Sequence, residues 1–366
     1  MKKLLSCILA LFLISSAFAI CSFAASNDVY VKDGGSGDGT SSTSPVGTLT
    51  AAFEKAAAMS GKATIHVVDT VSWDLGTAEF APVAHTNTIT VTGGKIVVTG
   101  SAKFWTITGP TVFENIEFNL AAIAHIRTRG NDLTFGKGVV MSDKTWSIRM
   151  YGSDDNLAEG SLTGSTNITL LSGSYYDVSA FQKGFNTPIN GTMNVTVGGT
   201  AFVNVLVVDR SAVNTAGRIT KAVFKLDGGT IGRFVANSDN VAASKDGAVE
   251  SFKVIVTKNF DIDAQNTDQY PVISGSSAAV VGNTLNGAEG SCKTILEVDA
   301  EIYDKLLAAK RPDDAAKNPG MAKVQVESFD VVKKISNADT SDATSIVILA
   351  SAVAAAGVFF AYRKHR

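Results

Sequence analysis

The sequence predicts an all-β protein built as a parallel β-helix, a solenoid whose successive turns stack on one another. Two observations support this prediction. Strand–glycine–strand segments recur at intervals of about 26 to 35 residues, as the spacing from Gly109 to Gly229 shows. Valine, isoleucine, threonine and phenylalanine dominate between positions 65 and 260, and these residues favour strands. Self-similarity at such a period is typical of a solenoid.

Alternation of apolar and polar residues predicts which side of each strand faces the interior. Met193, Val195 and Val197 are expected to point inward, while Asn194 and Thr196 point outward. The same pattern is found in residues 89–91, 167–170 and 252–256. The sequence therefore predicts about 8 to 10 rungs, hence a stack roughly 40 to 50 Å long at about 4.8 Å per rung.

The first segment resembles a secretory signal. Lys2 and Lys3 precede an apolar run from Leu4 to Ile20 and a group of small residues, so a signal peptide is predicted over residues 1–25. Cys292 is then the single cysteine beyond the signal, and the exported chain is expected to lack an intramolecular disulfide.

The stretch "VYVKDGGSGDGTSSTSPVGTLTAAFEKA" opens the predicted mature chain, and residues 26–62 are interpreted as an N-terminal strand, a loop and a capping helix. The helix is expected over residues 48–59, with one apolar face covering the first rung. The loop has neither the Gly-Lys-Ser/Thr ending nor the glycine spacing of nucleotide-binding loops. A structural turn is the main prediction for it, and a calcium site formed by Asp33 and Asp38 is the alternative.

The opening stretch and strands such as "TGPTVFENIEF" resemble the pectin-lyase-like right-handed parallel β-helix superfamily, over about residues 28 to 275. The resemblance implies a right-handed β-helix over residues 63–290. It also implies two classes of function, because relatives include polysaccharide lyases and hydrolases as well as adhesins and surface proteins.

The C-terminal part is divided into four segments. A distal cap is predicted over residues 291–335, with a short helix in "DAEIYDKLLAAKRPDD" and a strand in "AKVQVESFDVVKKI". A polar linker over 336–343, an uncharged transmembrane anchor over 344–362 and a basic cytoplasmic tail over 363–366 follow. This end resembles the sorting region of Gram-positive surface proteins, although Ala338 stands where the sorting motif has a proline.

The enzymatic hypothesis is a lyase acting on uronate-containing glycans. Such a mechanism needs carboxylates that hold Ca²⁺ and an arginine or lysine that removes a proton. The residues suited to these roles lie in and after "HIRTRGND". They are Arg127, Arg129, Asp132, Asp143 and Lys144.

The binding hypothesis places a ligand on loops that precede successive glycine-side strands, because loops at one corner of a stack form a contiguous surface. The candidate ligand-binding residues are Tyr151, Asp154, Asp155, Asp209, Arg210 and Arg218. Tyr175 or Tyr176 offers a ring for stacking on a sugar. Asn167, Asn190 and Asn194 begin Asn-x-Thr triplets, which are interpreted as outward strand or turn positions.

Taken together, the sequence predicts a bacterial cell-surface protein for adhesion or structural display that binds polysaccharide or another surface polymer without a cofactor. The formal net charge of −2 indicates no nucleic-acid partner. A polysaccharide lyase or glycoside hydrolase, with Ca²⁺ as its cofactor, is the alternative.

Overall fold

The computed structural model describes residues 27–142, 148–152, 162–163, 165–179, 189–209, 219–237, 249–264, 272–274, 293–308, 325–327 and 330–334. Met1–Lys333 form one compact unit, which contains all of these residues except Lys334. The described part is a parallel, solenoid-like all-β fold with two helices, as predicted.

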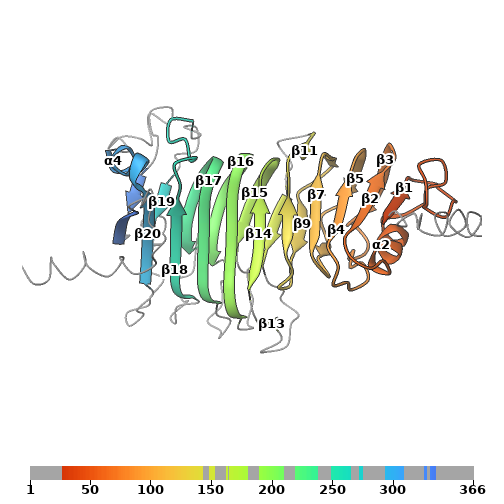
Figure 1. Ribbon diagram of the computed structural model, residues 1–366, viewed down its shortest axis with the longest axis horizontal. Coiled ribbons are helices and arrows are strands. Elements are labelled where there is room, and N and C mark those ends of the chain that lie inside the picture. Colours follow the sequence, from red (N-terminus) through yellow and green to blue (C-terminus); the bar gives the residue numbers. More distant parts are fainter. Residues whose placement is uncertain are drawn as a thin grey trace, which may run out of the picture. The chain divides into compact units, whose positions relative to one another are not determined.

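The longest set of paired strands, here called the first ladder, joins ten strands in parallel (Figure 1). They are β1 (Asp28–Val31), β2 (Ala63–Val67), β4 (Ile89–Thr92), β7 (Thr111–Glu114), β10 (Leu133–Phe135), β14 (Thr166–Leu170), β16 (Ile189–Asp209), β17 (Ile219–Asn237), β18 (Val249–Val256) and β20 (Lys293–Asp299). Ten strands agree with the predicted rung number. The ladder continues through β20, beyond the boundary predicted at position 290.

A second ladder runs along another side of the stack. Its strands are β6 (Phe104–Thr106), β9 (Ala124–Arg127), β12 (Ile148–Tyr151), β15 (Ser174–Ser179), the later parts of β16 and β17, β19 (Val272–Ser274) and β21 (Gln325–Glu327). β13 (Leu162–Thr163) pairs with the start of β16, and β22 (Asp330–Lys334) pairs with β20.

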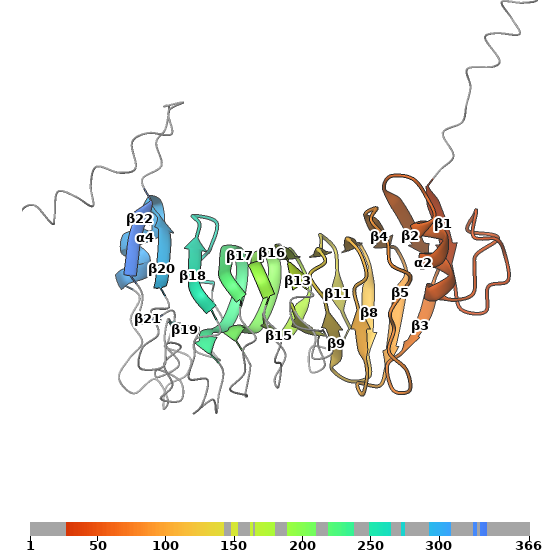
Figure 2. The same cartoon turned by 90° about the horizontal axis from the view of Figure 1, so that it is seen from below.

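A third ladder is shorter and contains β3 (Thr70–Asp74), β5 (Lys95–Thr99), β8 (Glu117–Leu120) and β11 (Val140–Met141), in that order (Figure 2). Beyond β11 the chain passes from the first to the second ladder through a bend. In β16 this bend lies at Gly198–Gly199, where Gly199 has φ +55°. A Cβ on Gly199 would lie 2.3 Å from the Leu171 carbonyl oxygen, so the bend requires glycine.

One inward residue from each first-ladder strand contributes to a continuous apolar column in the interior, as the alternation predicts. This column runs from Val29 through Ile65, Val91, Phe113, Phe135, Leu170, Val197, Leu226 and Val256 to Val298. All ten side chains are buried.

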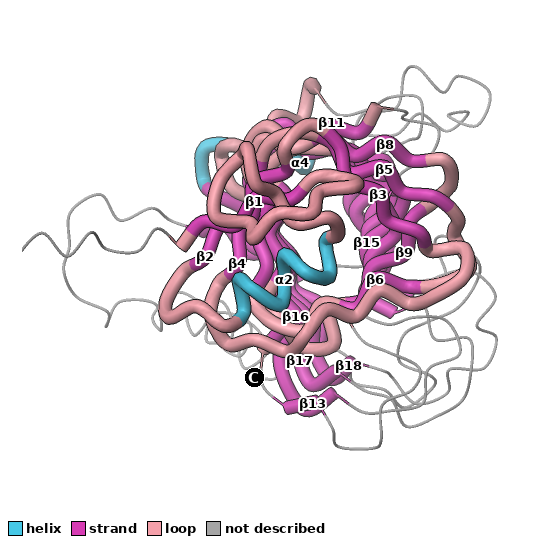
Figure 3. Tube along the Cα trace, turned by 90° about the vertical axis from the view of Figure 1, so that its right-hand side faces the viewer, coloured by secondary structure: helices cyan, strands magenta, loops and turns pink. Residues whose placement is uncertain are grey.

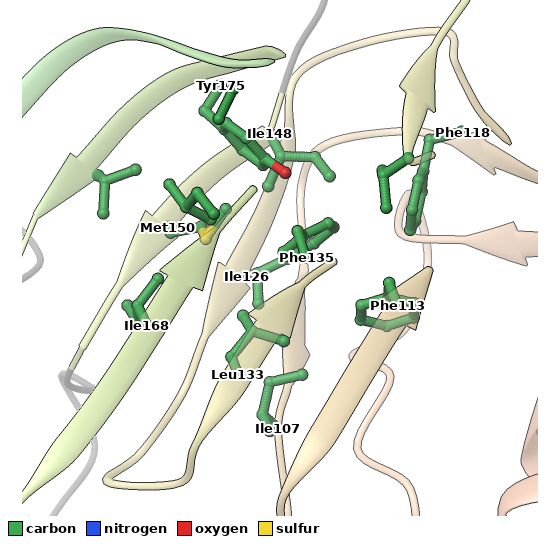
Figure 4. Packing of buried hydrophobic residues seen from close by; sticks show 14 of the residues in the cluster. Ile107, Phe113, Phe118, Ile126, Leu133, Phe135, Ile148, Met150, Ile168 and Tyr175 are labelled. Atoms are coloured by element: carbon green, nitrogen blue, oxygen red, sulfur yellow. The ribbon is translucent and has the colours of Figure 1, made fainter. Parts of the chain in front are cut away.

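Aromatic side chains widen the core where the third ladder is present. The Phe113 and Phe135 rings are 5.0 Å apart, and the Phe135 and Tyr175 rings are 5.3 Å apart. Figure 4 shows Tyr175 directed into the interior with Phe135 and Ile148. The prediction that Tyr175 offers a ring to a sugar is therefore wrong, since its side chain is fully buried.

Helix α2 (Leu49–Ala57) contacts β1, β2, β3 and β4, and Figure 3 shows it within the ring of ladders seen end-on. The Thr48 hydroxyl caps it by accepting a hydrogen bond from the Ala51 amide. Phe53 is buried and packs edge-on against Trp105 at 6.4 Å. The predicted lid is present, although the helix is shorter than residues 48–59.

Helix α4 (Ala300–Ala308) follows β20 directly, and its Leu306 is buried while Leu307 is 39% exposed. The single strand predicted after it is two strands, β21 and β22. No helix within the described ranges is long and apolar enough to cross a membrane. The predicted signal peptide (1–25), linker and membrane span (344–362) lie outside these ranges.

Candidate functional site

The outward face of the second ladder brings together polar and aromatic side chains from successive rungs. In one row, the register pairs Phe104 with His125, His125 with Arg149 and Arg149 with Asp177. In the neighbouring row it pairs Thr106 with Arg127, Arg127 with Tyr151 and Tyr151 with Ser179. Outward residues of a solenoid are expected to be solvated, yet several of these are buried.

Arg127 is the buried centre of a hydrogen-bond network, with only 2% of its surface exposed. Its Nε donates to the Thr106 hydroxyl at 2.8 Å, and its Nη2 lies 2.7 Å from a carboxylate oxygen of Glu79. The Thr106 hydroxyl in turn donates to the other Glu79 oxygen. The guanidinium also lies 4.5 Å above the Phe104 ring, so both Arg127 and Phe104 are held in place.

Glu79 keeps its negative charge in this network. Burial alone would raise the pKa of the Glu79 carboxyl, but hydrogen bonds from Arg127 and Thr106 and the charges of Arg127 and Arg129 outweigh burial and lower it. Glu79 and Arg127 therefore form a charged pair at neutral pH.

Arg149 forms the second charged pair on this face. Its Nε lies 2.8 Å from the Asp177 carboxylate, and its guanidinium lies 4.7 Å from the centre of the Tyr176 ring. Burial alone would lower the pKa of Arg149, but the Asp177 carboxylate and Tyr151 raise it. Asp177 is fully buried, whereas the Arg149 side chain is 24% exposed. The ion pair with Asp177 therefore holds the Arg149 guanidinium in place, and part of the Arg149 side chain remains accessible to solvent.

His125 lies between the two pairs. Its ring centre is 5.5 Å from that of Phe104 and 6.2 Å from that of Tyr151. Burial, together with the positive charge of Arg149, lowers the pKa of His125 to about 4. At neutral pH His125 is therefore an uncharged ring within an aromatic group.

The solvent-accessible part of this face, here called the outer strip, is formed by Phe104, His125, Arg149 and Tyr176, one from each of four successive rungs. Tyr176 is 36% exposed. Rings with an interposed guanidinium suit a sugar polymer, because rings stack on sugar faces and the guanidinium donates to hydroxyl or carboxylate oxygens.

The structure separates the residues of the lyase hypothesis. Arg127 bonds to Thr106 and Glu79, whereas one oxygen of Asp132 accepts hydrogen bonds from the backbone and side-chain amides of Asn167. Arg129 lies in the turn after β9 with φ +49°. Asp143 and Lys144 lie outside the described residues.

Two of the predicted ligand-binding residues fall within the described strands. Tyr151, the last residue of β12, is only 5% exposed, and its ring packs 6.2 Å from both Phe104 and His125, behind the outer strip. Asp209 ends β16, where it pairs with Asn237. Asp154, Asp155, Arg210 and Arg218 lie outside the described residues.

The two aspartates of the calcium hypothesis make separate structural bonds. Asp33 accepts hydrogen bonds from the backbone amide and the hydroxyl of Ser72, and so ties the loop to β3. One Asp38 oxygen accepts from the amide and hydroxyl of Thr40. No group of three potential metal ligands occurs among the described histidine, cysteine, aspartate and glutamate residues.

The sequence alone did not indicate a site role for Glu79, Phe104, His125, Arg149 or Asp177. Outward residues of three strands do show a repeated pattern, in Phe104-x-Thr106, His125-x-Arg127 and Arg149-x-Tyr151. Aligning these triplets by their inward middle residue would have placed the rows side by side.

Comparison of the chain with known protein families, curated proteins and solved structures finds no match. The fold and the outer strip define the chain as a parallel β-solenoid with an aromatic and cationic face on its second ladder.

Proposed function

We propose that this protein is an exported bacterial surface protein that displays a pectin-lyase-like right-handed β-helix and binds a polysaccharide or another surface polymer through the outer strip. The observation that carries the proposal is the alignment of Phe104, His125 and Arg149 on consecutive rungs, with the Tyr176 ring against the Arg149 guanidinium. The ion pair between Glu79 and the buried Arg127 supports this row. The predicted signal peptide and the span at 344–362 supply export and anchoring.

The orientation of the polymer follows from the spacing of the strip. Neighbouring strands lie about 4.8 Å apart, so contacts repeat at that interval along the stack axis. A polymer lying along this axis meets rings and a guanidinium in succession and gains affinity from several weak contacts at once.

The proposal is tested with the purified full chain in detergent, by measuring retention on immobilised polygalacturonate and on neutral glycans. Tyr176→Ala and Arg149→Gln are expected to lower retention about tenfold each, because each removes a stacking or hydrogen-bonding contact. Lys333→Gln is the matched control, since Lys333 lies 4.9 Å from the Tyr303 ring centre in a similar cation–ring pair far along the chain.

Two results would contradict the proposal. Retention that is lost equally in the Lys333→Gln control would mean that the strip is not the site. A calcium-dependent rise in absorbance from unsaturated products would show catalysis and favour the lyase alternative.

A further inference from the structure

A second face of the molecule, on the first ladder, carries a regular row of hydroxyl groups. The register aligns one outward residue from each of six successive strands. They are Thr64, Thr90, Val112, Thr134, Thr169 and Thr196. At about 4.8 Å per strand, the row extends roughly 24 Å along the stack.

The hydroxyls of these five threonines make no side-chain hydrogen bond within the part of the chain that the structure describes. Several threonines elsewhere in that part use their hydroxyls internally, as Thr48 does at the cap of α2, Thr106 with Glu79 and Thr257 with Asp227. Strand propensity accounts for a β-branched residue at each position but not for its hydroxyl. The row therefore presents repeated groups, each with one donor and two acceptor sites, to an external partner.

An amide ladder runs beside the last part of this row. The Asn194 amide nitrogen donates to the Asn167 side-chain oxygen at 3.0 Å, and the Asn167 amide nitrogen donates to Asp132 at 2.8 Å. Asn167 and Asn194 are the first residues of Asn-x-Thr triplets, so each amide lies two residues from a threonine of the row. The ladder holds both amides in one orientation and leaves each nitrogen a second hydrogen to donate.

The electrostatics of this face differ from those of the outer strip. Every residue of the row from Thr64 to Thr196 is uncharged, and the charged residues in register are Asp28 before Thr64 and Lys225 after Thr196. An anionic polymer bound here would lack cationic partners along most of its length, which is costly for a charged group. Hydroxyl groups of a neutral glycan both donate and accept, and so match threonine and asparagine side chains.

We propose that these five threonines, with Asn167 and Asn194, form a second binding site that takes a neutral polysaccharide chain lying along the stack axis. The site is called the hydroxyl array. Its repeat is set by the strand spacing and is comparable with the length of one sugar ring, so successive rungs bind successive units. The array shares no residue with the outer strip, and the proposal does not depend on binding there.

The test measures retention of the purified full chain in detergent on insoluble mannan, xylan and β-glucan. The triple variant Thr134→Val, Thr169→Val and Thr196→Val keeps the β-branched shape and removes three hydroxyls. Retention on at least one neutral glycan is expected to fall roughly a hundredfold, about fivefold per hydroxyl. Unchanged circular dichroism and melting temperature would show that the variant is folded.

Two further variants sharpen the test. Val112→Thr fills the gap in the row and is expected to raise retention about fivefold. Thr70→Val is the matched control, because Thr70 pairs with Lys95 on the third ladder and likewise makes no side-chain hydrogen bond within the described residues. Its retention is expected to equal that of the wild type.

The proposal is overturned if the full chain is retained on none of the neutral glycans, or if the triple variant binds as well as the wild type. Self-association lost in the triple variant, without glycan retention, would instead make the array an interface between copies. If Arg149→Gln loses polygalacturonate binding but keeps neutral-glycan binding, the outer strip and the hydroxyl array bind independently. This result would support the array as a separate site.

Discussion

The part of the stack with three ladders and the part with two differ in the side chains that fill the interior. Where β3, β5, β8 and β11 add a third side, rings such as Trp105, Phe113 and Phe135 fill the interior. Beyond β11, the same first-ladder column continues with Leu170, Val197, Leu226 and Val256. Within this column the phenylalanines occur only in the three-ladder part, although Phe224 of β17 is also fully buried.

The outward face changes along with the core. In the part with three ladders, the outer row of the second ladder contains His125 and Arg149, whereas the position of β16 in register with this row is Val205. Three of the four outer-strip residues, Phe104, His125 and Arg149, therefore lie in the part of the stack that has three ladders.

The largest test of this comparison is a core truncation in each part. Trp105→Ala is expected to lower the free energy of unfolding by about 3–5 kcal/mol, because the ring is fully buried among Phe53, Trp73, Phe80 and Phe113. Val197→Ala removes much less volume and is expected to cost about 2 kcal/mol. Denaturant unfolding of both full-chain variants measures the difference, and equal costs would refute the idea that the part with three ladders depends more on its rings.

A smaller effect is expected at the bend that replaces the third ladder. Gly199→Ala combines a left-handed backbone with a Cβ 2.3 Å from the Leu171 carbonyl oxygen, and is expected to cost about 2–3 kcal/mol. Gly61→Ala is the control, since Gly61 has φ +78° but open space around its Cβ, and only the backbone cost of about 1 kcal/mol remains. Melting temperatures that fall equally would show that close packing at the bend contributes nothing.

The smallest effect concerns pH and the outer face of the part with three ladders. The pKa of His125 in the folded protein, about 4, lies below its ordinary value of 6.5, so folding favours the neutral ring. Stability that is fully present above pH 6.5 is therefore lost as the pH falls towards 4. His125→Gln is expected to flatten the decline in melting temperature between pH 7 and pH 5. An equally steep decline in both proteins would mean that other groups cause it.

Local pattern predicted most of the strands because the two-residue period of a strand is a local property. Met193, Val195 and Val197 face inward as expected. The two-residue alternation is interrupted in β15. A register shift opposite Ile148 and Arg149 places the inward residues Tyr175 and Val178 three positions apart instead of two. Tyr175 is turned inside and Tyr176 outside, which the sequence alone did not distinguish.

The candidate site was harder to predict because its partners are distant in sequence. Arg127 was recognised as an outward cation, but its burial depends on Glu79, which lies outside the predicted strand repeat. Asp132 is only five residues from Arg127, yet a turn with Arg129 at φ +49° separates them and places Asp132 on the first ladder. Strand periodicity predicts whether a residue points inward or outward. It does not predict to which ladder the residue belongs after a turn.

The lid formed by α2 affects the order in which the rungs of the stack unfold. Each rung is bonded only to the rung before and the rung after it, so the stack behaves as a one-dimensional chain of coupled units that unravels from its ends. Thr48 and Phe53 fasten one end through a helix cap and an aromatic contact. Amide hydrogen exchange is therefore expected to be slow in β2 and β4, and the rungs beside the lid should be the last to lose protection.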